Sequence, residues 1–95
     1  MNADFASIRN HHERAVFDAV AAAAARYPLL ADAALLADVA CVALNRLPPR
    51  YIRHEVDLAF HLTEKERREV GRAVDEAVQF AFEFVQARHA MRARV

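Results

Sequence analysis

The stretch Leu44-Asn45-Arg46-Leu47-Pro48-Pro49-Arg50-Tyr51 divides the chain. The first half is predicted to be helical, and any helix in the second half must be a separate element. Two consecutive prolines fix two backbone φ angles and remove two N–H donors, so a helix cannot continue through them. Leu47, which precedes the first proline, is pushed toward an extended conformation. We therefore expect a stiff turn at Pro48-Pro49 that ends one helix.

Two helices are expected before this turn. The first should run from about Ala3 to Arg26, with Asn2 as its N-cap and Tyr27-Pro28 ending it. Its apolar stripe follows steps of three and four residues and comprises Phe5, Ile8, His12, Val16, Ala19, Val20, Ala23 and Tyr27. The second helix should begin at Asp32 as N-cap and end near Asn45 or Arg46. His12 lies on the first stripe, so we expect a hydrogen-bonded core residue there.

After the turn, residues 51–62 alternate in part between apolar and charged side chains, which favours an extended or irregular connector. A connector of that length in a small domain is often functional. The third helix begins at Thr63, because Thr63 and Glu66 form a capping box that satisfies two free backbone donors. It should continue to about Arg88. The sequence thus predicts an all-α, three-helix domain with a proline turn and an extended connector.

The chain has 95 residues, which suits a single domain spanning residues 1–95. Thirteen basic and thirteen acidic residues cancel, so there is no excess positive charge to hold the protein on nucleic acid or an anionic membrane. Any anion site must therefore be local. A single cysteine, the absence of a long apolar run and the mixed N-terminal residues predict a cytoplasmic protein without membrane insertion.

The third helix carries two apolar stripes, which is more apolar surface than one packing partner can cover. One stripe contains Val74 and Val78, and the adjoining one contains Phe80 and Phe84. We expect one stripe to pack on the protein's own core and the other on a second subunit, which predicts a homodimer. The predicted interface residues are Val74, Val78, Phe80 and Phe84.

Three cations, Arg46, Arg50 and Arg53, fall within eight positions around the rigid turn. Guanidinium groups offer planar, paired donors to phosphate oxygens and guanine edges. Asn45 can bond free backbone carbonyls at the helix end or a ligand. The alternative is a structural turn after a helix C-cap, with Tyr51 packed in the core and the arginines in solvent.

The same residues carry a family resemblance. The run from Ala43 to Tyr51, Ala-Leu-Asn-Arg-Leu-Pro-Pro-Arg-Tyr, together with Asp38-Val39 and the acidic Glu13, resembles the late competence development ComFB family. The resemblance extends from about Asn10 to Ile52. It implies a small helical, dimeric, cytoplasmic bacterial protein connected with competence, type IV pili or motility, and with the second messenger cyclic di-GMP.

A cyclic dinucleotide presents phosphates and bases, which arginine forks and stacking side chains recognise. The resemblance therefore suggests a site in which arginines contact phosphate or guanine and Tyr51 stacks on a base. The predicted ligand-binding residues are Asn45, Arg46, Pro48, Pro49, Arg50, Tyr51, Arg53 and His54. Family members with a cysteine cluster before Asp38-Val39 can bind zinc, but residues 28–37 here contain no cysteine, so zinc is not carried over.

Metal and catalytic interpretations are weaker. His11 and His12 are adjacent, so on a helix their side chains diverge by roughly 100° and cannot both face one ion. Cys41 is predicted to lie mid-helix among apolar neighbours, where a thiol is usually inert. We therefore expect no metal, no cofactor and no enzymatic activity.

Two function hypotheses remain. In the first, the protein is a signalling protein that binds cyclic di-GMP and relays it to a protein partner, and Arg46, Arg50 and Arg53 are sensitive to substitution. In the alternative, it is a dimeric helical interaction module with no small ligand. In that case Phe80 and Phe84 matter and the arginines tolerate alanine. Duplex DNA binding is disfavoured by the neutral net charge.

Overall fold

The structure is a computed structural model that describes residues 2–93, with the side chains of all of these except 57 and 60. The main helices are α1 (His12–Ala23), α2 (Ala33–Asn45) and α4 (Glu64–Ala93), and a shorter helix, α3 (Glu55–His61), precedes α4. Strands β1 (Arg9–Asn10) and β2 (Tyr51–Ile52) form a small antiparallel ladder. Short 3-10 turns lie at Phe5–Ser7, Ala24–Arg26 and Pro28–Leu30. The predicted all-α class is confirmed, with this small ladder added.

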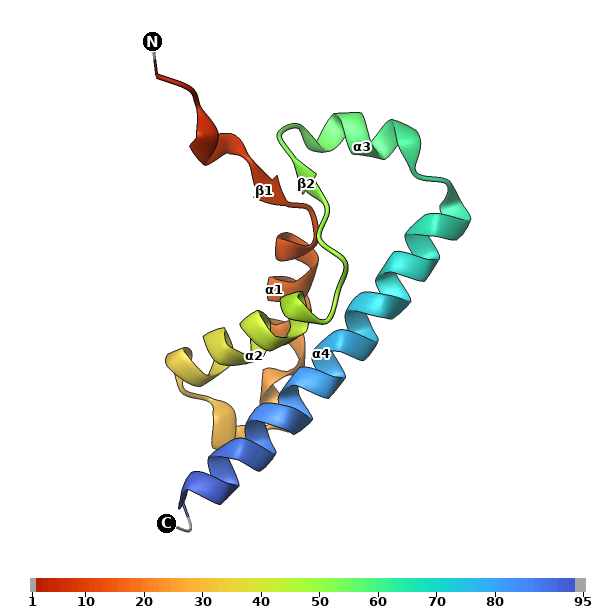
Figure 1. Cartoon of the computed structure of the whole chain (residues 1–95). Helices are drawn as coiled ribbons and strands as arrows, with labels where there is room; N and C mark the ends of the chain where they lie inside the picture. The colour runs from red at the N-terminus through yellow and green to blue at the C-terminus, as the bar shows by residue number, and fades with distance from the viewer. Residues whose placement is uncertain (1, 94–95) are drawn as a thin grey trace.

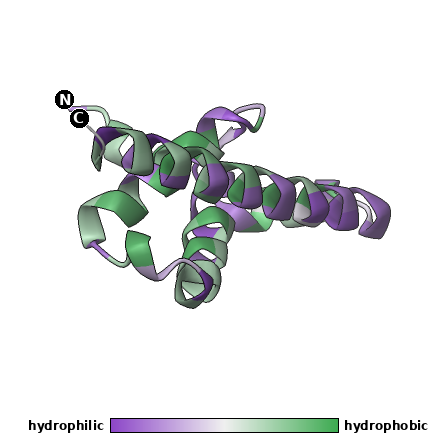
Figure 2. Cartoon of the chain, turned by 90° about the horizontal axis from the view of Figure 1, so that it is seen from below, coloured by the Kyte–Doolittle hydropathy of each residue, from purple (hydrophilic) through white to green (hydrophobic). Residues whose placement is uncertain are grey.

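The core lies where α1, α2 and the C-terminal two-thirds of α4 meet (Figure 1). Val16, Val39 and Phe82 are completely buried there, and the Tyr27 ring stacks on Phe82 with centroids 4.3 Å apart. Hydrophobic segments gather at this junction, while the N-terminal end of α4 is hydrophilic and extends past it (Figure 2). That end of α4 is therefore free to form one wall of a site.

Local capping chemistry places the starts of two helices as predicted. The Asp32 carboxylate accepts hydrogen bonds from the backbone N–H groups of Ala34 and Leu35, at 2.6 and 3.3 Å. At α4, the Thr63 hydroxyl accepts from Glu66 N–H at 3.1 Å, and Glu66 Oε2 accepts from Thr63 N–H at 3.3 Å. Both N-caps and the capping box are confirmed.

The predicted start of the first helix is wrong. α1 begins at His12, whose N–H donates to Asn10 Oδ1 at 3.1 Å, and Asn2 is not an N-cap. Phe5 and Ile8, which were expected on the buried stripe, are 74% and 46% exposed. The reason is a long-range interaction: Asn10 pairs with Tyr51 in the β-ladder, and this pairing prevails over the local helical periodicity.

The predicted extended connector is wrong in part, because residues 55–61 form α3. Leu58 is its buried anchor, and Arg67 Nη2 donates to the Ala59 carbonyl at 2.7 Å. A seven-residue helix is too short to display helical periodicity in the sequence. α4 also continues to Ala93, beyond the predicted end near Arg88, and residues 94–95 lie outside the described residues. Within residues 2–93, no helix is both long and apolar enough to span a bilayer.

Candidate functional site

The proline turn leads the chain from the end of α2 to β2. Backbone N–H groups of Arg46 and Leu47 donate to Ala43 and Leu44 carbonyls at 3.0 and 3.3 Å, which closes the helix. Leu47 is buried, whereas Pro48 and Pro49 are exposed. The turn is therefore anchored by Leu47 and kept stiff by the two proline rings.

Asn10 joins this turn to the start of α1. Its Oδ1 accepts from His12 N–H at 3.1 Å and from Arg50 N–H at 3.4 Å. His11 N–H also donates to the Arg50 carbonyl at 2.6 Å. Residues 40 positions apart are thus held together by one side chain and one backbone bond. The consequence is that Arg50 lies beside the N-terminus of α1.

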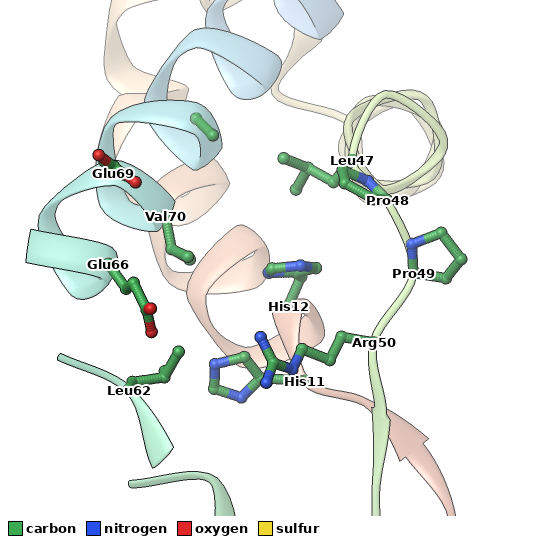
Figure 3. Close-up of a pocket in the computed structure, with 11 residues that line it drawn as sticks. His11, His12, Leu47, Pro48, Pro49, Arg50, Leu62, Glu66, Glu69 and Val70 are labelled. Carbon is green, nitrogen blue, oxygen red and sulfur yellow. The ribbon is translucent and has the colours of Figure 1, made fainter.

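A cavity of about 350 Å³ opens between the start of α1, the proline turn and the N-terminal part of α4 (Figure 3). Its volume falls at the lower end of the range of about 300–1,000 Å³ for small-molecule sites. Its lining residues are His11, His12, Leu47, Pro48, Pro49, Arg50, Leu62, Glu66, Glu69, Val70 and Ala73. Three elements that are distant in the sequence therefore share one cavity.

The cavity has a basic wall and an acidic wall. In Figure 3 the Arg50 guanidinium lies near the His11 ring, and Glu66 points from α4 into the space between the two walls. Among the described residues, no ion pair joins Arg50 to Glu66 or Glu69. Opposite charges thus face each other across a gap instead of neutralising each other, which suits a ligand with groups of both kinds.

The two histidines of the basic wall have unusual surroundings. Burial, together with His12 and Arg50, lowers the pKa of His11, and Glu55 opposes this change. His12 is only 6% exposed, and its Nδ1 has no hydrogen-bond partner among the described residues. The prediction of a core histidine is confirmed, but the hydrogen bond expected for it is missing at Nδ1. A buried polar atom without a partner costs free energy and can mark a ligand site.

The three arginines do not converge as predicted. Arg46 lies over the Phe80 ring, 3.8 Å from its centroid, and does not line the cavity. Arg53 Nε donates to Ser7 Oγ at 2.8 Å, and its Nη2 lies 3.9 Å from Asp4 Oδ2. Of these three arginines, only Arg50 lines the cavity.

Of the other predicted ligand residues, some line the cavity and the others lie outside it. Pro48 and Pro49 line the cavity. Asn45 Nδ2 instead donates to the Cys41 carbonyl at 3.1 Å, within α2. Tyr51 is 69% exposed on β2, so it is not packed in the core, and His54 is exposed at the N-cap of α3. Neither Tyr51 nor His54 lines this cavity.

Comparison with known protein families gives one match. Residues 9–89 match the family described as late competence development protein ComFB. The chain belongs to the ComFB family. A search of curated proteins and a search of solved structures found no match.

The ComFB match covers more of the chain than the sequence resemblance from Asn10 to Ile52. It extends from β1 through most of α4, so both walls of the cavity lie inside the family region. Sequence reasoning missed His11, His12 and the α4 residues as parts of one site. The only signal at the histidines was the start of the resemblance at Asn10, and Glu66 carried only the signal of a capping box.

This chain also presents an aromatic surface, formed by Phe80 and Phe84 on α4. Their rings are 5.9 Å apart, and they are 36% and 46% exposed. Arg88 lies over Phe84, with its CZ atom 5.6 Å from the ring centroid, and pairs with Asp38 at 3.7 Å. Two arginines therefore cover part of this surface.

The predicted interface must be corrected for its other two residues. Val74 and Val78 are 3% and 4% exposed and pack in the chain's own core, because they lie on the face of α4 turned toward α1 and α2. Only Phe80 and Phe84 of the four remain at the surface. Within the described residues, no group of three or more His, Cys, Asp or Glu side chains is arranged to hold a metal ion.

Proposed function

We propose that this ComFB-family protein is a non-catalytic cytoplasmic signalling protein that binds cyclic di-GMP and relays it to a protein partner. The observation that carries the proposal is the cavity where Arg50 and His11 face Glu66 across an open gap. The ligand class comes from the family resemblance, and the cavity supplies groups that suit it.

The basic wall suits a phosphodiester. Arg50 provides a guanidinium with paired donors, and α1 begins at the cavity with the positive end of its helix dipole. His11 gains a counter-charge if a phosphate binds beside it. These groups together supply a local anion site in a chain whose net charge is zero.

The size and stiffness of the site set how the ligand binds. A cavity of about 350 Å³ accommodates one base and its neighbouring phosphate more readily than a whole dinucleotide. The other half of the ligand then extends out of the cavity. Because the prolines restrict the backbone that leads to Arg50 before binding, less backbone entropy is lost on association.

Isothermal titration calorimetry with cyclic di-GMP tests the proposal. We expect the parent protein to bind, and Arg50→Ala to lose affinity at least about tenfold, since a charged hydrogen bond contributes about 1.5–3 kcal/mol. Arg46→Ala is the matched control, because Arg46 lies on Phe80 outside the cavity. The absence of binding heat for the parent protein at tens of micromolar would overturn the proposal.

A second candidate function is a homodimeric interaction module, favoured by the exposed Phe80 and Phe84 rings. Light scattering after gel filtration distinguishes it. We expect Phe84→Glu to shift a dimer toward monomer if this surface joins two copies, with Glu83→Gln, at an exposed neighbouring position, as the control. A monomeric parent protein would contradict dimerisation.

A further inference from the structure

Glu66 takes part in the capping box of α4 and also has a carboxylate oxygen that is not used there. Its backbone N–H donates to Thr63 Oγ1 at 3.1 Å, and its Oε2 accepts from Thr63 N–H at 3.3 Å. Among the described residues, no hydrogen bond uses Oε1. The capping box therefore fixes the carboxylate in one orientation at the cavity wall and leaves Oε1, with the second lone pair of Oε2, to accept from a ligand.

The opposite wall presents donors. Arg50 lines the same cavity from the proline turn, and no ion pair of 4.0 Å or less joins it to Glu66. The same cavity is also lined by the apolar side chains of Leu47, Leu62 and Val70, and in Figure 3 Val70 lies beside Glu66 on α4. The cavity thus has an acceptor on one side, a donor on the other and apolar side chains elsewhere in its lining.

This pattern matches one kind of planar base. Guanine carries adjacent N–H donors, N1–H and the N2 amino group, on one edge and the acceptors O6 and N7 on another. Adenine has an unprotonated N1 where guanine has a donor, so its lone pair meets the carboxylate lone pair and is repelled. A donor-rich edge fits Glu66, and an acceptor-rich edge fits Arg50.

We propose that the cavity is a guanine slot in which Glu66 accepts hydrogen bonds from the N1–H and N2 amino group of the base, and so selects guanine over adenine. This inference rests on the proposed binding of a cyclic dinucleotide. It adds the residue that reads the base, whereas Arg50 alone satisfies acceptor atoms that phosphates also offer. Glu66 is here a specificity-determining residue.

Glu66→Gln isolates this role from the structural one. Glutamine also serves at this position of a capping box, because its carbonyl oxygen still accepts from Thr63 N–H. Its amide nitrogen, however, replaces the free carboxylate oxygen with a donor. Glu76→Gln is the matched control, since Glu76 is exposed on the same helix and lines none of the described cavities.

The test measures affinities of parent and variants for cyclic di-GMP, cyclic di-AMP and the cyclic di-inosine analogue, which lacks the N2 amino group. For the parent we expect at least about fivefold weaker binding of the inosine analogue and a larger loss with cyclic di-AMP. Glu66→Gln should reduce both preferences at least about fivefold, and Glu76→Gln should keep them.

The outcomes separate this inference from the function on which it rests. If the parent binds cyclic di-GMP but binds the inosine analogue equally well, the guanine slot is overturned and nucleotide binding stands. Unchanged base selectivity in a folded Glu66→Gln variant would likewise overturn the guanine slot and leave nucleotide binding standing. If the parent binds none of the three, both proposals fail. The analogue measurement needs no variant, so a Glu66→Gln protein that fails to fold does not prevent the decision.

Discussion

The two ends of the molecule are held together in different ways. At the junction of α1, α2 and α4, completely buried side chains such as Val16 and Phe82 form a continuous apolar core. At the cavity end, the ladder, the proline turn and α3 are joined mostly by single polar contacts. These include the Asn10 hydrogen bonds, the Arg9–Glu55 ion pair at 3.3 Å and the Arg67 bond to the Ala59 carbonyl.

This difference assigns stability to the core and, under the proposed function, ligand binding to the cavity end. Burial of a large apolar side chain contributes about 1.5–3 kcal/mol, whereas an exposed polar contact contributes about 1 kcal/mol or less. Regions held by few contacts open more readily and are the usual location of ligand sites. Substitutions in the core should therefore have the largest effects on unfolding, and those at the cavity end should have smaller effects on unfolding and should also change binding.

The largest effect on stability is expected for Phe82→Ala. Phe82 is completely buried and stacks on Tyr27, so its removal leaves a cavity in the core. We expect a loss of about 3–5 kcal/mol in the free energy of unfolding, measured by urea denaturation. A loss below about 1 kcal/mol would contradict the assignment of this junction as the stabilising core.

Asn10→Ala should change both the free energy of unfolding and the affinity for the ligand. It removes the acceptor shared by His12 N–H and Arg50 N–H, so we expect a loss of about 1–3 kcal/mol in unfolding free energy. Affinity for cyclic di-GMP should fall as well, because Arg50 is no longer held beside α1. Asn45→Ala is the control, since that side chain bonds only within α2. If the Asn10→Ala and Asn45→Ala variants bind cyclic di-GMP with equal affinity, the Asn10 hydrogen bonds do not position Arg50 for binding.

Thr63→Ala tests the end of α4 that forms the acidic wall. Loss of the cap hydroxyl should lower unfolding free energy by about 1 kcal/mol, and Thr63→Ser should restore most of it. Denaturation curves of the two variants provide the measurement. If alanine and serine behave alike, the capping bond does not order this wall.

The smallest effect is expected from His11. Burial, with His12 and Arg50, lowers its pKa below the ordinary value of 6.5, so below pH 6.5 the unfolded chain binds more protons at this group than the folded protein. The contribution of His11 to stability therefore falls as the pH falls through this range. Urea denaturation between about pH 5 and pH 7 should show a flatter pH dependence for His11→Gln than for the parent. Parallel curves would contradict the lowered pKa.

Local chemistry made part of this fold predictable. The Asp32 cap, the Thr63-Glu66 capping box and the proline turn each depend on neighbours within a few residues, and each lies where the sequence places it. The apolar periodicity also identified the core residues of α1, but on α4 it did not single out Phe82, the largest completely buried side chain. Such features need no knowledge of tertiary contacts.

The parts of the fold and of the site that the sequence did not predict depend on contacts between residues that are distant in the sequence. The pairing of Asn10 with Tyr51 determines where α1 begins, and a strand of two residues has no recognisable local sequence pattern. The same ladder turned Arg50 toward the cavity while Arg46 and Arg53 found partners in Phe80 and Ser7. Proximity in sequence grouped three arginines that the turn separates, and it left out Glu66, which the fold brings opposite Arg50.

The most direct test of the account is an amide NMR titration of the full chain with cyclic di-GMP. The account predicts shift changes concentrated at His11, His12, Arg50 and Glu66, which line the cavity, and little change at Phe80 and Phe84, which do not line it. Changes confined to the aromatic surface, or no changes at all, would contradict the claim that this cavity binds the nucleotide.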